Sequence, residues 1–402
     1  MQEKVFDQPD FDNDAFSSAF SHQSAETMAE VFAGKRHGYF YSRVQNPLVE
    51  RLETELAELD GGIGAVACAS GMAAITNVIL ALTEPGDVVL AGQGLFGGTY
   101  AFLTRWLPRY GIETTFFEVD HAENLEQYLN KKVKLIFCES LGNPNMKMAD
   151  IDFLAQLAHS RQIPLIIDNT ILSPALLKPG EWGCDIVIHS TTKFIDGHGR
   201  AIGGCIIDMC NDTWERKNIS ILREYLPAFG EKSLLQCLRS DYISTLGACL
   251  SPYHAFLHLE GLKTLKLRTE RQSRNALELA QYLQKHKNVQ QVSYPGLTEH
   301  AQHDLARKYL GNLFGGVLCF DVGTAEKAFA VLNALKRIRL VANLGDSRTL
   351  AIHPASTIYR GFFPPEQEKL GVTTGLIRVS VGIEPVEEII EDFDQALSAL
   401  TS

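Results

Sequence analysis

The feature that most constrains this chain is a short apolar run, a turn and a helical stretch, repeated from residue 60 to about 210. The runs are almost continuously apolar, which is typical of parallel strands that are covered by helices on both faces. Amphipathic stretches such as Met72–Leu82 and Ile151–Arg161 lie between them. The pattern predicts an α/β domain with a large, mostly parallel sheet, its strands being AVACA (65–69), VVLA (88–91), TTFFEV (114–119), LIFCE (135–139), LIID (165–168), IVIHS (186–190) and CIID (205–208).

The pattern changes outside this region, and the changes divide the chain into three parts. Residues 1–45 have no sustained period and many Gly, Ser and aromatic residues, so we interpret them as an extended N-terminal arm. Residues 46–245 form the α/β domain. Residues 246–402 begin with helical sequence to about 286 and continue with strand-like runs and two helical stretches, which predicts a smaller C-terminal α+β domain. The FFPPEQEKL stretch (362–370) is expected to be a surface loop.

Composition argues against several classes of protein. The 402 residues carry 37 Lys and Arg against 48 Asp and Glu, and this net charge of −11 disfavours nucleic-acid and anionic membrane partners, which need clustered cations. No apolar run approaches the ~18 residues of a membrane span, and the N-terminus lacks the apolar core of a secretory signal. The eight cysteines form no CxxC pair, so free thiols in a reducing compartment are expected. These features predict a cytoplasmic enzyme.

A lysine and an aspartate follow two of the predicted strands. Parallel sheets bind ligands beyond the carboxyl ends of their strands. Asp168 ends the LIID run, and Lys193 follows the IVIHS run one strand–helix–strand step later. Such a pair suits pyridoxal 5'-phosphate (PLP), which forms a Schiff base with a lysine and needs an acid to keep its pyridine nitrogen protonated. Considered separately, Lys193 could also be an exposed lysine in a loop, and Asp168 could be the N-cap of a helix.

Hydroxyl groups and a glycine at neighbouring strand ends suit the phosphate of that cofactor. Ser190 and Thr192 accompany the lysine in the HSTTK segment. Ser70-Gly71-Met72 follows the first predicted strand and opens a helical run, where the glycine allows close approach and the helix N-terminus presents oriented N–H groups to an anion. A serine N-cap explains this second motif equally well.

The sequence also contains patterns of two other kinds of site. Gly92-Gln93-Gly94-Leu95-Phe96-Gly97 matches GxGxxG and makes a nicotinamide-dependent oxidoreductase an alternative of another class. It follows the second strand-like run rather than the first, however, and leaves the lysine of HSTTK unexplained. His254 and His258, like His300 and His303, lack a carboxylate or thiolate at metal-ligand spacing, so no metal site is predicted. A non-catalytic binding module that kept the fold is a further alternative.

The chain resembles the PLP enzymes of cysteine and methionine metabolism, a group that includes cystathionine γ-synthases, γ-lyases and O-acylhomoserine sulfhydrylases. The resemblance covers nearly the whole chain and implies a fold-type-I PLP transferase. It is carried by ordered motifs: Tyr41-Ser42-Arg43 with Asn46-Pro47, Ser70-Gly71-Met72, Phe96-Gly97-Gly98-Thr99, Glu139 with Asn143-Pro144, Asp168-Asn169-Thr170, Ser190 with Lys193, Asn343-Leu344-Gly345-Asp346, His353-Pro354-Ala355-Ser356 and Arg378-Val379-Ser380.

The resemblance implies roles for the residues at matching positions. Lys193 would carry the cofactor and then move protons between substrate carbons, and Asp168 would pair with the pyridine nitrogen. Arg378 would bind the substrate carboxylate in a bidentate manner, and Asn343 would also contact the substrate. The remaining cofactor-binding residues would be Ser70, Gly71, Met72, Phe96, Asn143, Ser190 and Thr192, joined by Tyr41 and Arg43 from a neighbouring subunit. Such a shared site implies a homotetramer built as a dimer of dimers.

Phe96 narrows the reaction within the family. Many members place a tyrosine at this position, and a phenylalanine can stack on the cofactor ring but cannot donate a proton. A carboxylate leaves without such help because the pKa of its acid is near ~4, whereas a thiolate, with a thiol pKa of about 8.5, needs it more. Gly98 is also a departure, since the γ-lyases often carry a cysteine there. The sequence thus favours conversion of an O-acyl-L-homoserine, with acetyl preferred, and sulfide to L-homocysteine; a γ-lyase or cystathionine γ-synthase is the alternative.

Overall fold

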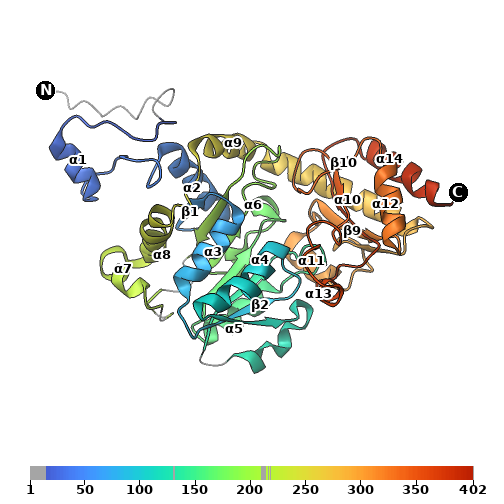
Figure 1. The fold of residues 1–402 in the computed structure, drawn as a ribbon, viewed down its shortest axis with the longest axis horizontal. Coiled ribbons are helices and arrows are strands. Elements are labelled where there is room, and N and C mark those ends of the chain that lie inside the picture. Colours follow the sequence, from blue (N-terminus) through green and yellow to red (C-terminus); the bar gives the residue numbers. More distant parts are fainter. Residues whose placement is uncertain (1–14, 130–131, 210–213, 216, 218, 402) are drawn as a thin grey trace.

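The computed structural model describes residues 15–129, 132–209, 214–215, 217 and 219–401. Figure 1 shows a large sheet domain, a smaller second domain joined to it through a long helix, and an N-terminal arm whose helix α1 (Ala25–Phe32) stands away from the sheet domain at one end of the molecule. Among the described residues no helix combines the length and apolar character needed to cross a bilayer.

The large sheet has seven strands in the order β1-β7-β6-β5-β4-β2-β3. All of the predicted strands form, and they pair in parallel except at β7, which runs antiparallel to both of its neighbours. The prediction of a mostly parallel sheet is therefore confirmed, with β7 as the exception. The bounds are Gly64–Cys68 (β1), Val88–Gly92 (β2), Glu113–Phe117 (β3), Val133–Glu139 (β4), Leu165–Asp168 (β5), Ile186–His189 (β6) and Gly204–Asp208 (β7).

Helices cover both faces of this sheet because successive side chains of its apolar strands point to opposite sides. One hydrophobic cluster joins the strands to α3 (Gly71–Leu82), and the other joins them to α2 (Pro47–Asp60) and α5 (Ile151–Ser160). Shorter helical segments complete the domain: α4 (Gly97–Ala101) with the turns Phe102–Trp106 and Leu107–Tyr110, then Val119–Tyr128, α6 (Ser173–Leu176), Pro179–Trp182, α7 (Leu222–Phe229), Gly230–Lys232, α8 (Ser233–Cys237) and Leu238–Thr245.

The second domain has a five-stranded sheet in the order β10-β11-β12-β9-β8. Its strands are Gln291–Ser293 (β8), Val317–Asp321 (β9), Arg339–Leu340 (β10), Leu350–Ile352 (β11) and Leu376–Ser380 (β12). Two helices, α9 (Pro252–Leu262) and α10 (Leu265–Lys285), lead into it. The others are α11 (His303–Leu310), α12 (Ala325–Ala334), α13 (Pro364–Lys369), α14 (Val386–Ser398) and the final turn Ala399–Thr401.

Two predictions for local structure were wrong. The stretch expected to be a surface loop at 362–370 contains α13, which begins with a proline at its first position and has the Glu366 side chain accepting from the Phe363 N–H at 3.0 Å. The arm contains α1 (Ala25–Phe32), which is capped by the Ser24 hydroxyl. Part of the arm, residues 1–14, lies outside the described residues.

Candidate active site

A cavity of about 270 Å³ opens at the carboxyl ends of the sheet strands, where parallel sheets bind ligands. The structure brings most of the predicted site residues together in its wall. They are Ser70, Gly71, Met72, Phe96, Asn143, Asp168, Ser190, Thr192, Lys193, Asn343 and Arg378. A larger cavity, of about 500 Å³, lies between the two domains and contains none of the predicted residues.

Lys193 lies in the turn that follows β6, and its ammonium group is directed to the loop after β10. Its Nζ donates to the Asn343 Oδ1 at 2.7 Å. Burial lowers the pKa of Lys193 to about 8, with a further contribution from the positive charge of Arg378. A substantial fraction of this amine is therefore neutral near physiological pH, as a nucleophile must be.

Asp168 ends β5 and lies beside a second buried carboxyl group, that of Glu139 at the end of β4. The two residues are partners in the register of the parallel strands. Burial raises the pKa of Asp168, although two hydrogen bonds from Thr170 to its Oδ1 oppose the shift. Burial and the neighbouring Asp168 raise the pKa of Glu139 well above its ordinary value. The pKa of Glu139 is raised more strongly than that of Asp168, so Asp168 is the member of the pair that more readily carries the negative charge.

Glu139 is a site residue to which sequence reasoning gave no role. Its Oε1 accepts a hydrogen bond from the backbone N–H of Phe96 at 2.6 Å, which ties the loop after β2 to the end of β4. The sequence signal that could have identified Glu139 is its position at the end of a predicted strand that neighbours the strand of Asp168. Thr170 is a second such residue: it bonds Asp168, and its hydroxyl accepts from the Ser190 N–H at 2.7 Å.

The N-terminus of α3 and the turn after β6 approach each other closely across one end of the cavity. The Ser70 hydroxyl caps α3 by accepting from the Ala73 N–H at 3.1 Å, so the N-cap interpretation holds for this side chain. A Cβ on Gly71 would lie 2.6 Å from the Ser190 Cβ, and only glycine allows this approach. The capping bond leaves the N–H groups of Gly71 and Met72 at the start of the helix for an anion.

The Thr192 side chain is partly committed elsewhere. Its hydroxyl donates to the Gly203 carbonyl at 3.1 Å and accepts from the Gly203 N–H at 3.0 Å. These bonds join the two ends of the segment Ser190–Gly203, which we call the lysine loop. The Thr192 N–H also donates to the Gly203 carbonyl, at 3.4 Å, so a phosphate contact at this residue would require a change of hydrogen-bond partner.

Arg378 is buried in β12, which is the central strand of the small sheet. The residue is therefore not an exposed arginine on an edge strand. Its guanidinium donates to the Asn343 carbonyl at 2.8 Å and to the Asn143 Oδ1 at 3.4 Å, while its Nε has no partner among the described residues. Burial lowers the pKa of this group. A buried guanidinium with an unsatisfied N–H at a cavity wall is suited to a carboxylate.

Phe96 is another residue of the cavity wall. The residue is 37% exposed. A Cβ on Gly98 would lie 2.7 Å from this ring and 3.1 Å from the Met72 sulfur. The phenylalanine therefore occupies the space that a side chain at position 98 would need.

Tyr41 and Arg43 do not reach the cavity of their own chain. Tyr41 is 43% exposed, and the Arg43 guanidinium lies 5.4 Å from its ring centroid. The same guanidinium donates to the Ser244 carbonyl. Both residues lie in the part of the arm that joins α1 to α2.

A family model described as Cys/Met metabolism PLP-dependent enzyme matches residues 14–398. The chain belongs to this family. The family is PLP-dependent, so the oxidoreductase alternative built on GxGxxG at 92–97 is wrong. In the structure, that motif leads into α4, a helix of only 5 residues.

Relatives within the family carry two different activities. The chain is 37% identical to the O-acetyl-L-homoserine sulfhydrylase of Leptospira meyeri, over 95% of this chain and 90% of that protein. It is also 37% identical to the L-methionine gamma-lyase of Porphyromonas gingivalis, over 96% and 91%. A solved structure from Campylobacter jejuni, described as a candidate O-acetylhomoserine (thiol)-lyase, matches with a TM-score of 0.89, 33% identity and coverage of 95% and 94%. That protein carries a pyridoxyl-lysine phosphate group. The small-molecule amino-acid chemistry of the family thus applies to this chain.

The residues present fit PLP. The α3 N-terminus and Ser190 form a close cradle for a phosphate, Lys193 supplies a partly neutral amine, and none of the described hydrogen bonds ends on the Asp168 Oδ2. When bound, the cofactor withdraws electrons from the carbon atoms of an amino-acid substrate.

The lowered pKa of Lys193 predicts how the cofactor loads. The attacking form is the neutral amine, so the second-order rate of PLP binding to the apoenzyme should rise about tenfold per pH unit below pH 8 and level off above it. Stopped-flow absorbance from pH 6 to pH 10 measures this rate. A rate that keeps rising to about pH 10, as for an ordinary lysine, would contradict a perturbed Lys193.

Proposed function

We propose that this protein catalyses γ-replacement, in which an O-acyl-L-homoserine and hydrogen sulfide give L-homocysteine and a carboxylic acid. The Cγ–O bond breaks, the carboxylate leaves with its electron pair, and a Cγ–S bond forms with sulfide. The acetyl ester is the preferred substrate. The observation that carries this proposal is Phe96 in the cavity wall, an aromatic ring with no hydroxyl to protonate a leaving group.

The chain's own residues divide the work around the substrate. We assign the substrate carboxylate to Arg378, a residue of the cavity wall whose Nε has no partner among the described residues. The Asn343 side chain, bonded to Lys193, holds the amine near the same point. The Lys193 Nζ would be the base that removes the α-proton and returns protons to neighbouring carbons, because its lowered pKa suits transfer in both directions.

A panel of substrates tests the proposal directly. Steady-state rates with O-acetyl-, O-succinyl- and O-phospho-L-homoserine, each with sulfide, should show the acetyl ester with the highest kcat/KM. L-methionine and L-cystathionine without sulfide should react at least about 100-fold more slowly, because a thiolate is the poorer leaving group. Cleavage of L-methionine at a comparable rate would assign the chain to the γ-lyase activity of its Porphyromonas gingivalis relative.

Changing Phe96 to tyrosine should shift the preference toward thioether substrates. The added hydroxyl supplies the missing proton donor, so the ratio of kcat/KM for L-cystathionine over O-acetyl-L-homoserine should rise about tenfold or more. Phe96→Leu is the matched control, because it changes the ring without adding a donor and should not raise this ratio. If Phe96→Tyr leaves the ratio unchanged, the leaving-group argument is wrong.

We further propose the arm (1–45), the PLP-binding domain (46–245) and the C-terminal domain (246–402) as the functional parts, with the arm completing a neighbouring subunit's site in a homotetramer. Two features support this assignment: Tyr41 and Arg43 lie outside their own cavity, and helix α1 of the arm stands away from the sheet domain. The seven described cysteines are free thiols, which supports a cytoplasmic location.

Hybrid subunits test the shared site. Arg43→Ala and Lys193→Ala should each be nearly inactive, but co-assembled dimers of the two contain one intact site. An equal mixture should therefore recover about a quarter of the wild-type activity, as expected for random pairing in a two-fold dimer. Recovery near zero would show that the arm acts in its own subunit or not at all, and light scattering would report the assembly size independently.

A further inference from the structure

One side of the lysine loop faces the cavity, and the other side faces α9. Its turn is closed by hydrogen bonds from the Asp196 N–H to the Thr191 carbonyl at 2.9 Å and from the Gly197 N–H to the Lys193 carbonyl at 2.8 Å. Lys193 projects from this turn toward the site, and Thr191 projects to the opposite side, where it is fully buried. Whatever holds the Thr191 side chain therefore also holds the backbone that carries the lysine.

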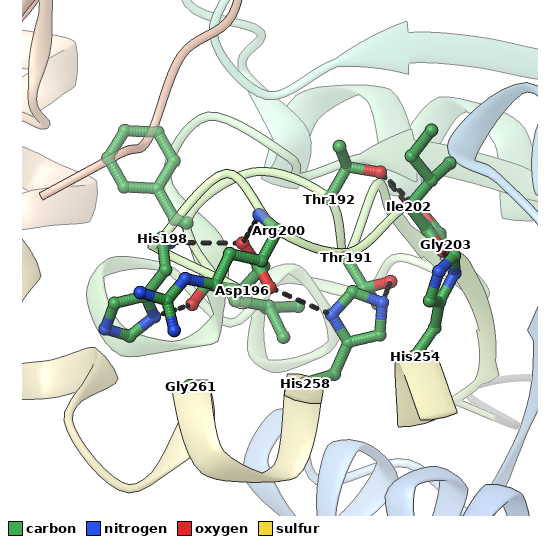
Figure 2. Close-up of polar contacts among 12 residues, drawn as sticks. Thr191, Thr192, Asp196, His198, Arg200, Ile202, Gly203, His254, His258 and Gly261 are labelled. Carbon is green, nitrogen blue, oxygen red and sulfur yellow. Dashed lines mark hydrogen bonds and ion pairs between the residues drawn. The ribbon is translucent and has the colours of Figure 1, made fainter. Parts of the chain in front are cut away.

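A single histidine of α9 fills the space below the turn. His258 is fully buried, and Figure 2 shows its ring lying between Thr191 and Asp196. Its Nε2 is hydrogen-bonded to the Thr191 Oγ1 at 3.0 Å. Its Nδ1 lies 3.9 Å from the Asp196 Oδ1 and has no hydrogen-bond partner among the described residues. A buried ring nitrogen about 1 Å short of a bond to a carboxylate is an incomplete contact.

Asp196 links this contact to the rest of the lysine loop. Its Oδ2 accepts from the backbone N–H groups of His198 at 3.1 Å and Arg200 at 3.0 Å. The carboxylate is itself fully buried. A movement of the turn toward α9 would thus complete the His258 bond to Asp196 while carrying the second half of the loop with it.

The surrounding packing leaves the histidine and the loop little freedom to move apart. A Cβ on Gly203 would lie 2.6 Å from the His258 Nε2, and a Cβ on Gly261 would lie 2.2 Å from the Ile195 carbonyl oxygen. Arg268 of α10 donates to the carbonyls of Phe194 at 2.8 Å and Ile195 at 3.3 Å. Helix α9 and the loop are therefore in direct backbone contact.

We propose that His258 is a positioning residue for Lys193, which acts through Thr191 and Asp196 to hold the lysine loop in the arrangement that retains PLP. This proposal rests on Lys193 being the lysine that carries the cofactor. PLP binding and the position of the lysine loop are then thermodynamically linked. A substitution that destabilises the binding-competent arrangement of the loop therefore weakens PLP binding to the same extent.

The charges around the imidazole agree with this role. Burial lowers the pKa of His258 to about 4, with His254 contributing to the shift and Asp196 opposing it. The Arg268 guanidinium and, near Gly199, the side chains of Asp346 and Arg348 are further charged groups packed against this loop. The histidine is consequently neutral at physiological pH, and it holds Thr191 by a hydrogen bond rather than by charge.

The test compares cofactor affinity with stability. The apoenzyme of each variant is titrated with PLP, and the melting temperature is measured with and without the cofactor. His258→Leu should raise the Kd for PLP about tenfold or more and lower the holoenzyme melting temperature more than that of the apoenzyme. His258→Gln, which retains a polar group able to bond Thr191, should remain within about threefold of the wild-type Kd.

A matched control separates positioning from general stability. His159 on α5 is partly buried and bonds Asp185 at 3.1 Å, at the opposite end of β6 from the lysine. His159→Leu should lower both melting temperatures equally and leave the Kd for PLP unchanged. If His258→Leu does not fold, Thr191→Val removes only the hydroxyl and should also raise the Kd.

Two results would overturn the proposal. One is an unchanged Kd in both His258→Leu and Thr191→Val, with equal losses of stability in apoenzyme and holoenzyme, which would make His258 a structural residue only. The other is a rise in Kd that His258→Gln shares in full. If PLP instead bound another lysine, peptide mapping of the reduced wild-type enzyme would show it, and that failure is distinct from these.

Discussion

Lys193→Ala is expected to abolish γ-replacement and the absorbance of bound PLP near ~420 nm. The variant loses both the covalent link to the cofactor and the amine that moves protons, and proton transfer by a positioned group alone contributes about 10²- to 10⁴-fold to a rate. Activity should therefore fall by at least about 10⁴-fold. Spectra and steady-state rates of the purified variant measure the two effects.

Lys193→Arg separates loss of charge from loss of the nucleophile. The guanidinium keeps a positive charge beside Asn343 but is not deprotonated at neutral pH, so this variant should be as inactive as Lys193→Ala. Wild-type absorbance or substantial activity in either variant would place the cofactor on a different lysine.

Asp168→Asn should lower kcat by about 10²- to 10³-fold, the scale of removing one electrostatic partner from a buried site. The amide keeps a hydrogen-bond acceptor for Thr170 but removes the negative charge that holds the pyridine nitrogen protonated. The pH dependence of the PLP absorbance should change with it. Steady-state rates and absorbance titrations provide the measurement.

Glu139→Gln is the matched control for Asp168→Asn. The pKa of Glu139 is raised well above its ordinary value, so an uncharged amide costs this position less than it costs Asp168, and the amide also keeps an acceptor for the Phe96 N–H. This variant should lose less than about tenfold in kcat. If the two substitutions have equal effects, or if the larger effect belongs to Glu139, the assignment of the charge to Asp168 is wrong.

Much of the large domain followed from the sequence because apolar strands and their order in the chain are local signals. The runs at 135–139, 165–168 and 186–190 form adjacent parallel strands, which places Asp168 and Lys193 at one edge. The direction of β7 did not follow, because strand direction depends on the path of the chain between Lys193 and Gly204 and not on apolar content. α13 was missed because its two prolines resemble a loop signal, although proline is accepted in the first turn of a helix.

The parts of the site that escaped prediction depend on contacts between distant segments. Glu139 acquires its role from strand register and from the Phe96 N–H, which lies 43 residues away in the chain. His258 was considered only as a metal ligand paired with His254, but the two side chains point to different groups: His258 bonds Thr191, and His254 bonds the Ile202 carbonyl. No local sequence pattern indicates the contact of His258 with Thr191 or that of His254 with Ile202.

The most direct test of the account is to find which residue of the wild-type enzyme carries PLP. The purified protein is treated with borohydride, which fixes the link between cofactor and lysine, and its peptides are then mapped by mass spectrometry. The account predicts a pyridoxyl phosphate adduct on the peptide that contains Lys193, and its loss when the enzyme is first incubated with O-acetyl-L-homoserine. An adduct on another lysine, or none in a protein that converts the ester, would contradict it.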